Sequence, residues 1–102
     1  MFTTYKRWTL KEGADESKLV DLVVNEIEPH YRKLDADVRL ELLRVDGTRS
    51  YLAVQHWPSR EHYQRVVASP DWQSWYAEYE ATLAAWDRLM SFESEWETET
   101  LV

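Results

Sequence analysis

The feature of this sequence that most limits its fold is the spacing of its few chain-breaking residues. Only two glycines and three prolines occur among 102 residues, and these residue types interrupt helices and strands most strongly. They divide the chain at Gly13, Pro29, Gly47, Pro58 and Pro70. No run rich in Ser, Gly and Pro is long enough to form a linker, so we expect residues 1–102 to form a single domain.

Four of the segments alternate between two sets of side chains, as β-strands do. We expect strands at 2–10, 38–45, 48–57 and 90–102. Asp46-Gly47 is a dipeptide preferred in two-residue type I′ hairpin turns, and such a turn places Val45 opposite Thr48. One face of this hairpin then carries Leu40, Leu42, Tyr51, Ala53 and Trp57, and the other carries Leu43, Leu52, Val54 and His56. Both faces are substantially apolar, so we expect both to be covered.

The last strand is expected to alternate strictly, with Met90, Phe92 and Trp96 on one face. The other face then carries Glu93, Glu95, Glu97 and Glu99. Like-facing strand residues lie roughly 6.5–7 Å apart, too far for several of them to bind one cation. We interpret the glutamates as the solvated face of an edge strand, which discourages pairing with other chains.

Helices are expected in the remaining segments. Asp15 is a good N-cap for a helix that stops or kinks at Pro29 and continues to Leu34, because a proline inside a helix lacks an N–H donor. Ser59 is expected to cap a second helical stretch, and Ser69-Pro70-Asp71 is a start signal for a longer one. In that helix Trp72, Trp75, Tyr76, Tyr79, Leu83, Trp86 and Met90 follow one face.

The resulting order, β-α-β-β-α-β, predicts an α+β ferredoxin-like fold. Its antiparallel sheet has the strand order 4-1-3-2, with both helices on one face and the other face bare. An exposed apolar sheet face is usually an interface or a ligand surface. Two such sheets closing on each other form a dimeric α+β barrel, so we expect a homodimer.

Charge and composition exclude several classes of function. Twelve Lys and Arg against 19 Asp and Glu give a net charge of −7, which disfavours nucleic acid and anionic membrane surfaces as partners. The absence of cysteine excludes thiolate metal sites and a cysteine nucleophile. No metal-binding run occurs, and no apolar segment has the length of a membrane span or signal peptide, so a cytoplasmic location is expected.

One stretch resembles a known family. Residues 51–75, YLAVQHWPSREHYQRVVASPDWQSW, resemble the antibiotic biosynthesis monooxygenase-like domains of the dimeric α+β barrel superfamily. Those domains have a strand ending in Trp, a Ser- or acid-capped helix, and a Ser-Pro step into a longer helix. The superfamily includes quinone-forming oxygenases that use no cofactor, haem-degrading enzymes and lactone isomerases.

The resemblance implies roles for particular residues. Trp57 matches the Trp that ends the third strand, and Tyr63 lies six residues later, as in the quinone-forming oxygenases. Those oxygenases carry an Asn four residues before the Trp, where this chain has Ala53, whose methyl group cannot orient a phenolate. The region that supplies a haem-ligating His in other relatives is Arg65-Val66-Val67 here, so we expect no haem, no other cofactor and no metal.

Histidines and aromatic residues complete the candidate site. His56 and His62 lie close to Trp57 in the sequence, and either could act as a general base near pH 7. His30, beside Pro29, is expected at the surface. The expected catalytic residues are therefore His56, His62 and Tyr63, and the expected substrate-binding residues are Trp57, Tyr5, Tyr51, Trp72 and Tyr76.

These observations favour a small cofactor-independent monooxygenase of the quinone-forming type that acts on an aromatic or polyketide-like molecule. Two alternatives remain open. One is a barrel that binds a hydrophobic small molecule without turnover, and the other is an isomerase or cyclase with a histidine base. Ala53 favours the alternatives, whereas the Trp57 and Tyr63 pair favours the oxygenase.

Overall fold

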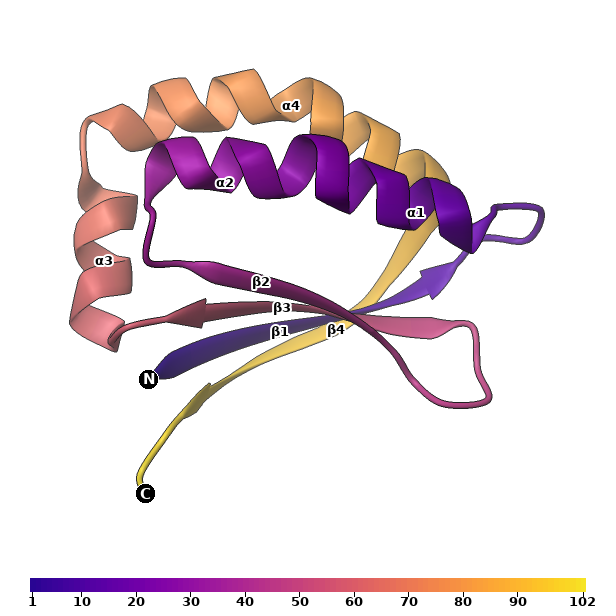
Figure 1. Ribbon diagram of the computed structural model, residues 1–102, viewed down its shortest axis with the longest axis horizontal. Coiled ribbons are helices and arrows are strands. Elements are labelled where there is room, and N and C mark those ends of the chain that lie inside the picture. Colours follow the sequence, from indigo (N-terminus) through magenta and orange to yellow (C-terminus); the bar gives the residue numbers. More distant parts are fainter.

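The computed structural model describes residues 1–102 and contains one antiparallel sheet of four strands in the order β2-β3-β1-β4. Along the chain the elements are β1 (Phe2–Leu10), α1 (Glu16–Leu22), η1 (Val23–Ile27), α2 (Glu28–Leu34), β2 (Arg39–Arg44), β3 (Ser50–Trp57), α3 (Arg60–Ala68), α4 (Asp71–Leu89) and β4 (Met90–Glu99). Helices α1, α2 and α4 cover one face of the sheet, and α3 lies at one end (Figure 1). The expected ferredoxin-like topology and strand order are confirmed.

The first helical region is continuous across Pro29. Between α1 and α2 the helix widens into the π-helical turn η1, in which the N–H of Glu28 donates to the carbonyl of Val23, five residues earlier. Pro29 then occupies the first turn of α2, where its missing N–H matters least. The expected interruption at Pro29 therefore takes the form of a widened turn, and the helix continues to Leu34.

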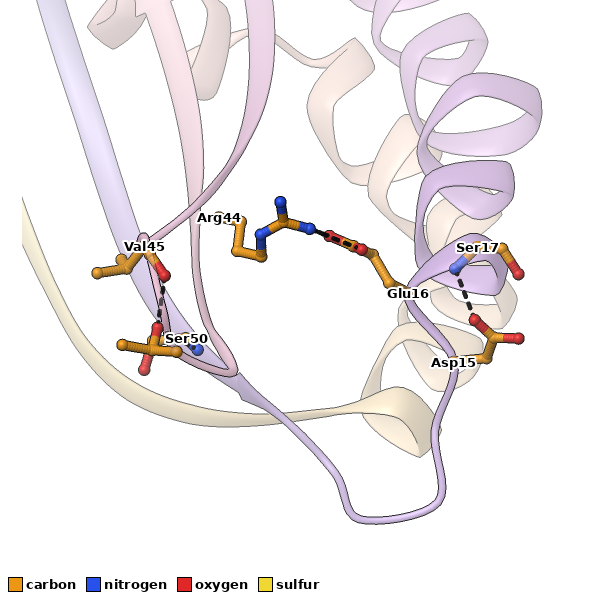
Figure 2. A network of polar contacts seen from close by, with 7 residues as sticks. Asp15, Glu16, Ser17, Arg44, Val45 and Ser50 are labelled. Atoms are coloured by element: carbon orange, nitrogen blue, oxygen red, sulfur yellow. Dashed lines mark hydrogen bonds and ion pairs between the residues drawn. The ribbon is translucent and has the colours of Figure 1, made fainter.

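Two of the expected helix starts are confirmed by their side-chain caps, whereas Pro70, which precedes α4, provides none. Asp15 Oδ1 accepts the N–H of Ser17 at 3.0 Å, and Ser59 Oγ accepts the N–H of His62 at 3.0 Å. Each cap satisfies a donor that the first turn of a helix leaves unpaired. Arg44 of β2 also binds Glu16 of α1 at 2.7 Å (Figure 2). This ion pair holds the start of α1 beside the hairpin end of the sheet.

The predicted two-residue type I′ turn is wrong. Val45 lies opposite Ser50, with its nitrogen 2.8 Å from the Ser50 carbonyl oxygen, and four residues close the loop. A type I′ turn requires a positive φ at Asp46, whereas Gly47 is the only loop residue with one, at 71°. The actual pairing is shifted from the predicted one by two residues. Because side chains alternate with a period of two, both predicted faces of the hairpin are retained.

The expected strict alternation of β4 is also wrong, because a β-bulge interrupts the strand. Trp8 lies opposite Phe92 and Arg7 lies opposite Ser94, so Glu93 is the extra residue. Its carboxylate lies 3.1 Å from Nε of Arg7. An extra residue reverses the facing of every side chain that follows it.

The bulge therefore exchanges the two faces of β4. Glu95 lies opposite Lys6 on the helix-covered face, while Trp96 lies opposite Tyr5 on the open face. The rings of Trp96 and Tyr5 stack with centroids 5.3 Å apart. β4 is an edge strand, as expected, and its glutamates are exposed.

The hydrophobic core lies between the helices and the covered face of the sheet. Trp57 and Phe2 are each 1% exposed, at the end of the sheet near α3. Along α4 the stripe Trp75, Tyr79 and Trp86 is buried, as its helical spacing predicts. None of the helices combines the length and the apolar character that crossing a membrane requires.

Candidate functional site

The main cavity of the molecule lies between the covered face of the sheet and the helices. Its volume is about 590 Å³, and 17 of its 23 lining residues are hydrophobic, which suits a small, largely apolar ligand. One end contains Tyr63 of α3, whose ring lies 5.2 Å from that of Phe2. The other contains Trp8 and Trp86, with ring centroids 5.6 Å apart. The cavity thus follows β1 for most of its length.

A partly buried polar network lies in the wall of this cavity. Gln55 of β3 donates from Nε2 to the hydroxyl of Tyr31 at 2.9 Å, and its Oε1 accepts the indole N–H of Trp57 at 3.2 Å. These contacts hold the amide in one orientation. The second N–H of the Gln55 amide has no partner, so it is available to an acceptor in the cavity.

Burial also sets the ionisation of the tyrosines in the wall. It raises the pKa of Tyr31 to about 12, although the hydrogen bond from Gln55 opposes the shift. Burial, followed by the neighbouring Tyr31, raises the pKa of Tyr79. Burial and then the charges of Glu97 and Glu95 raise the pKa of Tyr63. All three phenols are protonated at neutral pH and can donate hydrogen bonds to a ligand, but they are not bases there.

Two indole N–H groups at the other end of the cavity lack partners. Nε1 of Trp8 and Nε1 of Trp86 are buried and form no hydrogen bond. A buried donor without a partner costs about 1–3 kcal/mol. The two N–H groups are enclosed within the aromatic wall at this end, and neither is exposed to the cavity.

Three of the residues singled out from the sequence line this cavity from the helices: Tyr63, Trp72 and Tyr76. Tyr5 also belongs to the lining, although its ring stacks on Trp96 on the open face of the sheet. Trp57 and Tyr51 do not line it, because both are core residues, exposed by 1% and 4%. Trp57 nevertheless contacts Tyr63, with ring centroids 5.1 Å apart. Trp57 therefore lies behind the wall of the cavity, where it packs against Tyr63 and donates a hydrogen bond to Gln55.

The two candidate histidines, His56 and His62, do not line the cavity, and they lie on different elements. His56 is on the open face of the sheet, where Nε2 contacts Glu41 and Nδ1 is 3.1 Å from Thr3 Oγ1. His62 is in the first turn of α3, where Nε2 contacts Asp35. Each histidine thus has a carboxylate partner that is remote in the sequence, and the structure does not bring the two to one site.

The expectation that His30 lies at the surface is wrong. It is 9% exposed and stacks on Trp75, with ring centroids 4.5 Å apart. Nε2 of His30 donates to the carbonyl of Trp75, and the indole N–H of Trp75 donates to the carbonyl of His30, both at 2.8 Å. These two hydrogen bonds hold α2 against α4, next to the part of the cavity that Trp75 lines.

A second group of polar side chains lies beside α3. Asp35, Asp37 and His62 each place one potential metal-ligating atom within 4.8 Å of the others. The N–H of Asp37 donates to Asp35 Oδ1 at 2.8 Å, and Asp35 Oδ2 contacts His62. None of the three lines the cavity.

Sequence reasoning missed Gln55 and Tyr31. Gln55 follows Ala53 on the same strand face, so the alternation of β3 was enough to place its amide in the wall. The helical spacing of Ile27, Tyr31 and Leu34 placed Tyr31 on the inner face of its helix, but not beside Gln55. The distance of 24 residues from Tyr31 to Gln55 is closed only by the tertiary fold.

Comparisons with known proteins agree on the fold. No protein-family model and no curated protein sequence matches the chain. Among solved structures, a substituted form of SnoaB, a cofactor-independent oxygenase from Streptomyces nogalater, is 19% identical, with a TM-score of 0.67 over 99% of this chain and 93% of that one. HapK from Hahella chejuensis is 17% identical, with a TM-score of 0.69 over 99% and 93% of the two chains.

A third similar structure is a candidate antibiotic biosynthesis monooxygenase from Nitrosomonas europaea. It is 12% identical and has a TM-score of 0.60 over 100% of both chains. TM-scores of 0.60–0.69 show a shared fold, but at identities of 12–19% they do not show a shared activity. The expected resemblance to antibiotic biosynthesis monooxygenase-like proteins is confirmed at that level.

Proposed function

We propose that this protein is a cofactor-independent monooxygenase that oxidises a planar aromatic or polyketide-like molecule to a quinone. The observation that carries the proposal is the cavity of about 590 Å³ beside an amide whose orientation is fixed and whose second N–H is unpaired. Aromatic walls suit a flat ligand, and a fixed amide N–H can bind its oxygen atom. Structural similarity to a cofactor-independent oxygenase supports the same assignment.

The reaction needs no redox group from the protein, because the substrate supplies the electrons. An anthrone-type substrate releases a proton to solvent, and its anion transfers one electron to dioxygen. The carbon radical and superoxide combine to a peroxide anion, which takes up a proton from solvent and loses water to leave a carbonyl group. The balance is one substrate and one dioxygen giving one quinone and one water.

In this scheme the protein binds and orients the substrate. Gln55 donates to its oxygen, Trp72 and Tyr76 contact its ring from α4, and Tyr63 closes one end of the cavity. Ala53 lies next to this amide on the same strand face. We propose that Gln55, two residues later, performs the hydrogen bonding that the methyl group of Ala53 cannot.

The first experiment measures dioxygen uptake and quinone formation from an anthrone with chelator present. Gln55→Leu removes the amide and is expected to lower kcat by about 10²-fold, the usual effect of losing one donor to a developing oxyanion. His56→Ala alters the next residue, on the opposite face, and tests the histidine base that the sequence suggested. His62→Ala and Tyr63→Phe test whether these groups take part in the proton transfer.

Three outcomes separate the alternatives. Wild-type turnover that falls in Gln55→Leu supports the proposal. Turnover that falls only in His56→Ala or His62→Ala assigns the proton transfer to a histidine and contradicts the role of Gln55. Binding of the anthrone without turnover supports the second candidate function, a hydrophobic small-molecule-binding protein, which the methyl group of Ala53 favours.

A further inference from the structure

Lys6 is an unusual residue for its position in the sheet. It lies on β1, a central strand, and its side chain is on the face that the helices cover, because its neighbours in register are Ala53 and Glu95. Inward positions of a central strand normally carry apolar residues, and lysine is rarely buried without a partner. Lys6 is nevertheless exposed, and it lines the cavity. The covering helices therefore leave open space above it.

The ammonium group of Lys6 has no partner within the chain. It forms no hydrogen bond, and no carboxylate lies within 4.0 Å of it. Lys6 is also the only lysine or arginine among the 23 lining residues. A ligand that displaces the water around this cation in a concave, largely apolar site interacts with it more strongly than at an open surface, because less water then screens the pair.

The other ionisable groups of the lining limit the ligands that this cation would select. Glu41, Glu95 and Glu97 are the lining carboxylates, and the remaining groups are tyrosines. The whole chain carries a net charge of −7. A ligand that is already an anion, such as a carboxylate or phosphate, is repelled throughout its approach. A weak acid approaches neutral and becomes charged only beside Lys6.

We propose that Lys6 binds the anionic oxygen of a phenol or enol that ionises inside the cavity, and so determines the substrate class as planar aromatic molecules with an acidic hydroxyl group. This inference rests on the proposed function and assigns its anion-stabilising residue. The ionisation itself is a simple equilibrium, in which the hydroxyl proton leaves to solvent at the open side of the cavity. Dioxygen is not involved in this step.

The test uses two probes that differ only at the ionising group. 2-Hydroxyanthraquinone changes colour when it ionises, and 2-methoxyanthraquinone cannot ionise. Absorbance titration between about pH 5 and 9, with saturating protein and chelator, gives the pKa of the bound hydroxyl. The raised pKa values of Tyr31, Tyr63 and Tyr79 keep these phenols protonated across that range. The colour change therefore reports the probe alone.

Four proteins are compared with the wild type. The wild type is expected to lower the pKa of the bound hydroxyl by at least one unit, the usual effect of a cation within 4–6 Å and a tenfold change in the ionisation constant. Lys6→Met should abolish this shift, and Lys6→Arg should retain it. Glu95→Gln should enlarge it by removing an opposing charge. Lys33→Met, which removes an exposed charge outside the cavity, is the matched control and should behave as wild type.

The outcomes distinguish this inference from the proposed function. An equal pKa of the bound hydroxyl in wild type and Lys6→Met would overturn the role of Lys6 while leaving the cavity as the binding site. The affinity for 2-methoxyanthraquinone should be the same in wild type and Lys6→Met. If Lys6→Met instead lost affinity equally for both probes, Lys6 would have only a structural role. Failure of the wild type to bind either probe would overturn the proposed function and this inference with it.

Discussion

At the scale of single residues, burial and a few fixed hydrogen bonds determine the chemistry of the cavity. Tyr31 and Gln55 illustrate this, because each takes its orientation from the other. His30 and Trp75 form a similar reciprocal pair behind the wall. Paired polar groups of this kind are tolerated in a core because each satisfies the other.

The raised pKa of Tyr31 predicts a loss of stability at alkaline pH. Its value is about 12 in the folded protein, against 10.0 for an ordinary tyrosine. The unfolded chain therefore releases this proton first, and stability falls as pH rises from about 10 towards 12. The expected slope is about 1.4 kcal/mol per pH unit for this group, with no loss below pH 9.

Urea unfolding of wild type and Tyr31→Phe from pH 8 to 11.5 measures this effect. The phenylalanine variant lacks the ionising group, so its free energy of unfolding should fall less steeply above pH 10. Tyr79 contacts Tyr31 and owes part of its raised pKa to it, so Tyr79→Phe and the double variant are measured alongside to separate the two groups. Equal slopes in the two proteins would show that Tyr31 ionises normally in the fold.

At the scale of elements, two local irregularities decide which side chains meet. The bulge at Glu93 turns Glu95 and Glu97 towards the cavity and Trp96 towards the open face. The π-helical turn η1 allows a continuous helix to include Pro29. The same helix places the hydroxyl of Tyr31 within hydrogen-bond distance of Gln55. Bulges and π-turns are often found next to functional sites for this reason.

The geometry of the β2–β3 loop gives a prediction at this scale. Gly47 has φ of 71° and nothing within 4 Å of the position that a Cβ would occupy. Gly47→Ala should therefore cost about 1–2 kcal/mol through backbone strain alone. Asp46→Ala should cost much less, because its φ is negative. Urea unfolding of both variants measures the loss of unfolding free energy. Comparable losses would indicate a positive φ at Asp46 as well, as in a type I′ turn, and would contradict the loop seen in the structure.

At the scale of the whole molecule, the sheet is covered on one face only (Figure 1). The open face carries Tyr5, Val54 and the large apolar residues Leu43 and Trp96, which are 41% and 40% exposed. An apolar sheet face of this kind is commonly an interface. We propose that a second copy of the chain covers it and forms a homodimer.

Sedimentation at low micromolar concentration tests this proposal. We expect a species of twice the 12.2 kDa chain mass. Leu43→Glu places a charge on the open face and should shift the protein towards monomer. Val24→Glu is the matched control, because Val24 is a similarly exposed apolar residue, 56% exposed, on the helical layer. A folded wild-type monomer at this concentration would contradict the proposal.

The sequence by itself determined the elements, their order and most of the core. Strand β1 was predicted with its observed bounds, and the caps Asp15 and Ser59 were found because these signals depend only on neighbouring residues. The stripe Trp75, Tyr79 and Trp86 was evident for the same reason, since helical periodicity is a local property. The strand order followed from the order of the elements.

Only the tertiary structure decided which side chains share the cavity. The bulge at Glu93 arises from pairing with β1, and no local signal in the alternating sequence marks it. His56 and His62, close in sequence, lie on different elements, and each contacts a carboxylate that is 15 or 27 residues away. Lys6 gains its significance in the same way, because the helices that leave it exposed lie far along the chain. Contacts of this kind depend on packing between distant segments, which periodicity and composition do not encode.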